Sequence, residues 1–142
     1  MKHYIKFIFL LLFFKCTSDT NKNLNISGSV KGLRKGKLYL QKYINDTMLI
    51  NIDSLKIEGL ENFEFNDSLS EAQFYFLALK KDETDTTLQK IPFFAEKGKI
   101  KITTRLNTFL SSAKVDGSEN QILWDEYLMV IRKFNNQNIE LV

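Results

Sequence analysis

The side chains with the widest chemistry, histidine and cysteine, each occur once in the 142 residues, and both lie near the N-terminus. His3 and Cys16 are separated by an apolar run, and no second imidazole or thiol follows. Zinc sites of the cysteine and histidine type, Ser-His-Asp or Cys-His catalysis and CxxC redox chemistry all need more of these groups. The sequence therefore predicts no catalysis and no cofactor for this chain.

Three smaller groupings of polar side chains are weaker candidates. Asp53-Ser54 could be half of a hydrolytic centre, but no base is present to activate the serine, and bonding to nearby backbone explains both residues. The acidic run 82–85 lacks the glycine and the twelfth-position glutamate of a calcium loop. Glu96 stands two residues before a glycine that a hairpin turn explains. We expect structural roles for these residues and no metal site.

Tyrosines are the best candidates for a ligand site. Tyr39, Tyr43 and Tyr75 could form an aromatic platform for a sugar or a peptide on an exposed sheet face. The alternative is that they pack as cross-strand pairs under a C-terminal helix. Both interpretations fit the sequence.

The N-terminal stretch predicts export. Lys2 and Lys6 precede an apolar run at 7–14, which is shorter than the roughly 20 residues that span a bilayer. A basic start followed by such a run is typical of a secretory signal. Since the run ends beside Cys16, the arrangement resembles a bacterial lipoprotein signal, whose cysteine carries the lipid. We expect a signal at 1–15, a lipidated Cys16 with a tether to residue 23, and a membrane anchor on the periplasmic side or at the cell surface.

One residue departs from the lipoprotein pattern. Lys15 precedes the cysteine, where such signals have a small residue. An uncleaved anchor and a signal cut beyond Cys16 are alternatives, although no A-x-A-like site follows. A further alternative is that 7–14 is a buried strand and Cys16 an inert core thiol.

The net charge of +3 belongs to the signal. Residues 1–15 hold three lysines and no acid, so that 17 of the 20 basic residues remain in the body, against 17 acidic ones. A neutral body without a basic stripe does not support binding of nucleic acid.

Apolar residues alternate with period two from residue 24 to residue 117, which predicts a β-domain. Short strands with Gly, Asn and Asp between them favour an antiparallel β-sandwich or partly open barrel of about seven to eight strands. Residues 74–79 are apolar on both faces and therefore need cover on both. Pro92 cannot donate to a ladder, which predicts an edge strand.

The period changes to a helical one at 118–142. Ser118 and Gln121 fit a capping box, and Leu123, Tyr127 and Phe134 recur on one side of the expected amphipathic helix. We expect this helix to cover the second apolar face of a sheet. Its apolar end without a cap is what a fragment of a longer protein would show.

Six stretches of the body together resemble a known family. They are 26–32 (ISGSVKG), 36–40 (GKLYL), 52–54 (IDS), 63–65 (FEF), 93–98 (FFAEKG) and 115–118 (VDGS). Their order is similar to the domain of unknown function 4369, the N-terminal β-domain of Bacteroidetes-type lipoproteins. The resemblance implies an exported β-domain that carries no accepted catalytic residues. In the family it often precedes a thioredoxin-like module, and residues 1–142 do not contain one.

The sequence thus predicts a non-catalytic, lipid-anchored module of the cell envelope that acts as a scaffold or binds a protein partner. One alternative is an accessory domain of a thiol–disulfide oxidoreductase whose catalytic part is not in this chain. Another is a sugar- or peptide-binding module.

Overall fold

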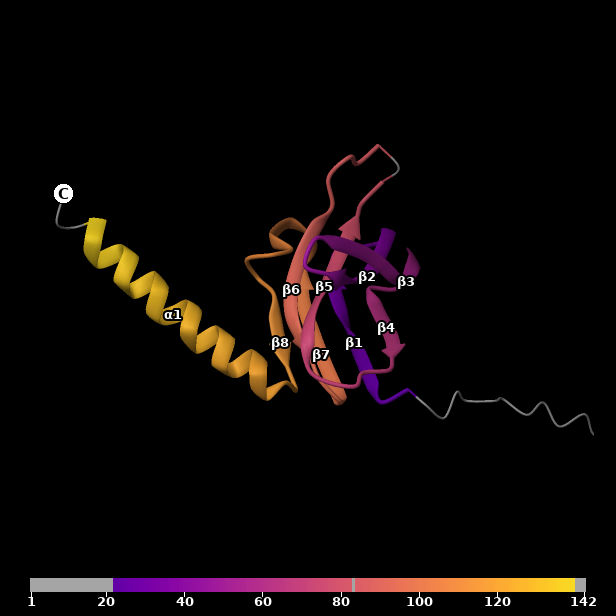
Figure 1. Ribbon diagram of the computed structural model, residues 1–142. Coiled ribbons are helices and arrows are strands. Elements are labelled where there is room, and N and C mark those ends of the chain that lie inside the picture. The colour runs from indigo at the N-terminus through magenta and orange to yellow at the C-terminus, as the bar shows by residue number, and fades with distance from the viewer. Residues whose placement is uncertain (1–21, 83, 140–142) are drawn as a thin grey trace, which may run out of the picture.

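A computed structural model describes residues 22–82 and 84–139, so the predicted signal and Cys16 lie outside the described residues. The described chain forms eight strands, a 3-10 turn and one α-helix (Figure 1). The strands are β1 (Leu24–Lys31), β2 (Lys35–Asn45), β3 (Met48–Glu58), β4 (Asn62–Asp67), β5 (Gln73–Lys80), β6 (Gln89–Ala95), β7 (Gly98–Arg105) and β8 (Lys114–Asp116). The turn η1 spans Leu106–Thr108 and the helix α1 spans Glu119–Ile139.

The strands form two four-stranded sheets in the orders β4-β1-β7-β8 and β3-β2-β5-β6, hereafter the first and the second sheet. All strand pairs are antiparallel except β1 with β7, which run parallel. The predicted sandwich of seven to eight short strands is confirmed. The parallel pair was not predicted. The alternation of apolar residues along a strand does not show which strand becomes its neighbour or in which direction that neighbour runs.

The core lies between the two sheets. Each strand turns alternate side chains inward, since successive side chains of a strand point to opposite faces. Ile26 of β1, Phe65 of β4 and Ile100 of β7 meet Leu40 of β2 and Phe93 of β6 in this layer, and all are buried. The apolar residues that the period marked as inward are thus the ones that hold the sheets together.

Two local predictions are confirmed. Strand β6, with Pro92, lies at the edge of the second sheet, where a missing backbone N–H costs least. Helix α1 begins after Ser118, whose Oγ accepts a hydrogen bond from the Gln121 N–H at 3.1 Å, which is one half of the predicted capping box; the Gln121 side chain accepts from the Phe94 N–H instead of completing it.

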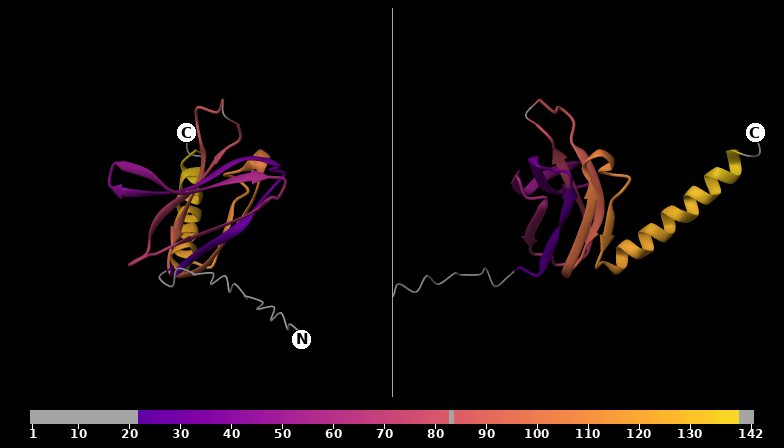
Figure 2. Two further views of the ribbon diagram at one scale, coloured as in Figure 1. Left: turned by 90° about the vertical axis from the view of Figure 1, so that its right-hand side faces the viewer. Right: turned by 180° about the vertical axis from the view of Figure 1, so that it is seen from behind.

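The expectation that α1 covers a sheet was wrong. Helix α1 leaves the sandwich at its first turns and runs away from both sheets, as Figures 1 and 2 show from opposite sides. Its contacts with the sandwich are confined to its first turns. Trp124 packs edge-on against Phe74 of β5 and Phe94 of β6 at ring-centroid distances of 5.3 and 6.1 Å, and Gln121 accepts a hydrogen bond from the Phe94 N–H. The second apolar face of β5 is therefore left largely without a covering element.

Candidate functional site

The carboxylates of Asp53, Asp82 and Asp85, which were considered from the sequence, accept hydrogen bonds from nearby backbone groups. Asp53 Oδ1 accepts a hydrogen bond from the Ser54 N–H at 2.7 Å. In the loop between β5 and β6, Asp82 accepts from Thr84, and these hydrogen bonds hold the pKa of its carboxyl below the usual value. Asp85 accepts from the Lys81 N–H at 2.8 Å. Over the described ranges, no group of three His, Cys, Asp or Glu side chains could hold a metal ion.

The three candidate tyrosines do not share a face. Tyr39 and Tyr43 point outward from the second sheet, where Tyr39 is partly exposed and Tyr43 is 45% exposed. Tyr75 pairs with Lys42 on the inward side and is fully buried. The structure therefore separates Tyr75 from the other two, and α1 does not cover them.

Tyr75 belongs instead to a polar bridge between the sheets. Its hydroxyl donates to Asp67 Oδ2 of β4 at 2.5 Å and lies 3.2 Å from Lys42 Nζ of β2. The Lys42 ammonium is also 3.6 Å from the Asp67 carboxylate. Burial, and then the hydrogen bond to Asp67, raises the pKa of Tyr75 well above its usual value. The phenol thus stays protonated and ties β5 to β4, which is a structural role.

Aromatic side chains gather on the outward side of the second sheet, called here the aromatic face. Its members are Tyr39 and Tyr43 of β2, Phe74 and Phe76 of β5, and Phe94 of β6. Tyr43 and Phe76 meet edge to face with centroids 5.6 Å apart, and Phe74 and Phe94 are 4.0 Å apart. An apolar face of this kind can bind the apolar face of a sugar ring or an apolar protein surface.

A buried polar group interrupts the aromatic face. Gln41 lies between Tyr39 and Tyr43 and is 6% exposed. Its amide nitrogen donates to Asn51 Oδ1 at 2.7 Å, but its carbonyl oxygen is buried and has no partner among the described residues. Gln41 therefore places a polar side chain under the aromatic face and ties β2 to β3.

Lysines collect at the end of the aromatic face near Tyr39. Lys37 of β2 lies directly opposite Lys56 of β3 and opposite Lys80 of β5. The Lys37 ammonium turns towards the Tyr39 ring, 5.0 Å from its centroid, and Lys56 makes an ion pair with Glu58. This row was not apparent from the sequence, because it requires the register of three strands. Like charges placed directly opposite destabilise a sheet.

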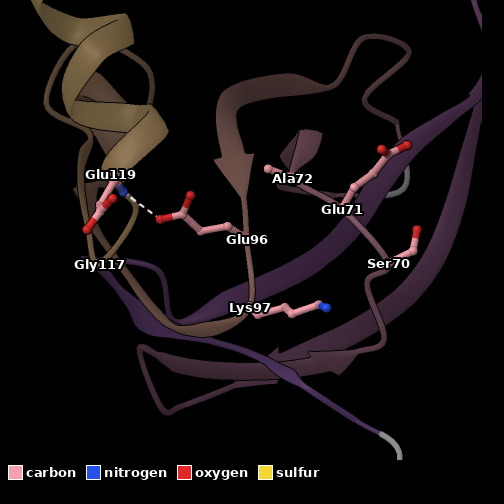
Figure 3. A pocket seen from close by; sticks show the side chains of 7 residues that line it. All are labelled: Ser70, Glu71, Ala72, Glu96, Lys97, Gly117 and Glu119. Atoms are coloured by element: carbon pink, nitrogen blue, oxygen red, sulfur yellow. Dashed lines mark hydrogen bonds between the residues drawn. The ribbon is translucent and has the colours of Figure 1, made fainter.

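A shallow pocket lies beside the start of α1. It has a volume of about 550 Å³ and is lined by Ser70, Glu71, Ala72, Glu96, Lys97, Gly117 and Glu119. Figure 3 shows that the Glu96 carboxylate points at the first N–H of α1. It also accepts from Asn120 Nδ2 at 2.6 Å. Glu96 thus caps the helix, a structural role that the sequence did not specify.

Hydrogen bonds favour the charged form of the Glu96 carboxyl. Burial raises the pKa of this carboxyl, but hydrogen bonds from Asn120, from the Glu119 N–H and from Ser118 outweigh burial and leave the pKa below its usual value. The anion also lies at the positive end of the helix dipole. The sequence gives little indication that Glu96 caps the helix, because the end of β6 and the start of α1 become neighbours only in the folded chain.

Four residues of the candidate site were not singled out from the sequence: Phe74, Phe76, Phe94 and Trp124. The sequence did indicate an apolar surface here, because it contains strands that are apolar on both sides. It was interpreted as a face that the helix would cover. In the structure only Trp124 reaches this face.

Comparison with known proteins gives a family and no function. No helix among the described residues is long and apolar enough to cross a membrane. No curated protein and no solved structure matches the chain. Residues 24–124 match the model of one family, which covers all eight strands and the start of α1. The chain therefore belongs to the family described as Domain of unknown function (DUF4369).

Proposed function

We propose that this chain is a non-enzymatic, lipid-anchored interaction module of the cell envelope, and that its aromatic face contacts an apolar surface of a protein partner. The observation that carries the proposal is the outward side of the second sheet, where five aromatic side chains lie together and Trp124 of α1 packs on only two of them, Phe74 and Phe94. Tyr43 is exposed and the other four are partly exposed, and a contiguous apolar patch on a protein surface marks interaction sites.

The anchor is argued from the N-terminal sequence alone. A basic start, an apolar run too short to span a bilayer, and a cysteine two residues after the end of that run support attachment through Cys16. Strand β1 begins at Leu24, so a tether of only a few residues would separate the sandwich from the membrane.

Two measurements test the proposal. Intact-mass analysis of protein from host membranes, beside a Cys16→Ala variant, is expected to show acyl chains that the variant lacks. An unmodified full-length mass in the soluble fraction contradicts the anchor.

The interaction face is tested by a photo-cross-linking residue at Tyr43 in host cells, with a matched probe at Lys101 on the outward side of the first sheet. Both positions are exposed and lie in strands. We expect a discrete cross-linked product from position 43, reduced by Phe76→Thr, and none from position 101. Identical products from both positions contradict a specific face.

A second candidate is a sugar- or peptide-binding module on the same face. It is supported by Tyr39 and Tyr43, which lie on one face that α1 does not cover. A glycan or peptide array that loses its signal with Tyr43→Ala, but not with Tyr75→Phe, would favour it over a protein partner.

A further inference from the structure

One side of α1 carries an apolar stripe that the sandwich does not cover. Leu123, Tyr127, Val130 and Phe134 recur at the spacing of the a and d positions of a coiled coil. Each is between 54% and 65% exposed. Isolated helices of this length are only marginally stable in water. A helix with an exposed apolar stripe is therefore stabilised when a second element packs on the stripe.

The sandwich holds the helix beside the stripe: the Trp124 ring flanks the stripe and stacks on Tyr127 with ring centroids 5.6 Å apart, while Tyr127 stays 54% exposed. Trp124 packs on the aromatic face, and Gln121 accepts a hydrogen bond from the Phe94 N–H at 3.0 Å. At 100° per residue, Trp124 lies about a quarter of a turn from the centre of the stripe. The stripe is therefore accessible while α1 stays fastened at its start.

The charges of α1 are divided between its two halves. Asp125 and Glu126 lie in the first half, and Arg132 and Lys133 lie in the second. With Leu123 and Val130 at d, the positions that flank the stripe as g are Glu126 and Lys133. The two flanking charges of one helix are therefore of opposite sign and one heptad apart.

An antiparallel pair of this helix is complementary in every layer. With a two-fold axis between residues 128 and 129, Leu123 of one copy lies opposite Phe134 of the other, and Tyr127 lies opposite Val130. Each layer then combines a larger with a smaller side chain. The flanking g residues meet as Glu126 with Lys133, and the symmetry produces this pair twice.

A parallel pair has none of this complementarity. It places Tyr127 on Tyr127 and Phe134 on Phe134. In a parallel pair each g residue lies beside an e residue of the partner, and the e residues here are Trp124 and Ile131. No opposite charges then meet across the stripe.

We propose that two copies of this chain associate through α1, antiparallel, with the stripe of Leu123, Tyr127, Val130 and Phe134 buried between them. The occupant of the stripe is thus a second copy of the same chain. The inference goes beyond the proposed function and uses a different surface from the aromatic face. Ile122 and Met129, which are also exposed, lie on the far side of the helix and take no part.

Charge reversal tests the pairing on the full chain, in detergent and with Cys16→Ser. Sedimentation equilibrium over a dilution series is expected to show a dimer that Glu126→Lys or Lys133→Glu weakens about tenfold, because each change turns two attractive pairs repulsive. The double variant restores the original affinity. Asp125→Lys, on the far side of the helix, is the matched control and changes the dimer little. Circular dichroism verifies that each variant is folded.

Disulfide trapping tests the orientation. Leu123→Cys and Phe134→Cys chains, each with Cys16→Ser, are mixed under mild oxidation. We expect the mixed dimer to form and the Phe134→Cys chain alone to remain unlinked. Efficient self-linking of Phe134→Cys overturns the antiparallel arrangement.

A protein that is monomeric at every concentration overturns the proposal altogether. That result leaves the cross-link from Tyr43 untouched, so the failure of this proposal and the failure of the proposed function are distinguishable.

Discussion

The outward faces of the two sheets differ in chemistry although their strands are built alike. The first sheet turns polar side chains outward: Asn25, Ser27 and Ser29 of β1, Asn62, Glu64 and Asn66 of β4, Lys99, Lys101 and Thr103 of β7, and Lys114 and Asp116 of β8. Asn25 donates to Glu64 and Asn66 at 2.6 and 2.8 Å, so this face makes hydrogen bonds of its own. The second sheet has the aromatic face in the same place.

The difference shows which sheet has all of its apolar surface covered and which sheet does not. A sheet with one polar face needs cover on one side only, whereas a sheet that is apolar on both sides needs cover on both. The first sheet meets its requirement through the core. The second sheet buries its inner face in the same core and leaves its outer face to Trp124 alone. Any partner of the sandwich is therefore expected on the second sheet.

The largest effect is expected from Gly28→Ala, which tests how tightly the first sheet is built. A Cβ at Gly28 would stand 1.7 Å from the Ile102 carbonyl oxygen of β7 and 2.9 Å from the Phe63 ring. Backbone cannot give way as a side chain tip can, so we expect a loss of about 3 kcal/mol or more of unfolding free energy in urea. Gly59→Ala is the control: its Cβ meets nothing within 4 Å, and its positive φ costs only about 1 kcal/mol. Equal losses would contradict the close packing.

Much of this fold was predictable from the sequence, because period two specifies which residues point inward. Ile26, Leu40 and Ile100 are apolar positions of that alternation, and all are buried. Neither the parallel pairing of β1 with β7 nor the row of lysines on β3, β2 and β5 was predictable. Both depend on contacts between strands that are far apart in the chain.

The candidate site was only partly predictable for a related reason. The pattern of α1 showed an apolar side, which requires a partner but does not say which one. We expected the sheet of the same chain to cover that side. In the structure Trp124 packs on the sheet, and the stripe lies exposed beside it, in contact with Trp124 through the ring of Tyr127.

Tyr75→Phe tests the polar bridge that joins the two sheets. In the unfolded chain a tyrosine ionises near pH 10, whereas the raised pKa keeps Tyr75 protonated in the folded protein. The bridge therefore contributes stability below about pH 10 that is lost as the pH rises further. Tyr75→Phe is expected to cost about 1 kcal/mol at pH 7 and to lose stability less steeply above pH 10. Urea unfolding at pH 8 and pH 11 measures both. Tyr43→Phe, on the exposed face, should keep the original pH dependence, and an equal change in both variants would exclude the bridge.

Glu96→Gln tests the one contact that partly covers the aromatic face, the start of α1. Because hydrogen bonds lower the folded pKa of Glu96, its contribution is present above the unfolded pKa and is lost as the pH falls through the folded value. Removing the charge from a helix cap is expected to cost about 1 kcal/mol at pH 7 and to abolish that acid dependence. Trp124 is the sole tryptophan and reports the docking of α1 by its fluorescence. Glu71→Gln is the control, because Glu71 lines the same pocket but points away from the helix (Figure 3).

The smallest effect is expected from Lys37→Glu, which changes the charge at one end of the aromatic face. Lys37 faces Lys56 and Lys80 on the two neighbouring strands, so a carboxylate there replaces two repulsive cross-strand pairs by two attractive ones. The change also removes the contact of the ammonium with the Tyr39 ring. We expect a net stabilisation of about 0.5 kcal/mol in low salt, measured by urea unfolding, that shrinks in 1 M salt through screening. The matched change on the polar face, Lys99→Glu, lies opposite Asn25 and should be nearly neutral. A gain of equal size from both variants would mean that it reflects overall charge and not the row of lysines.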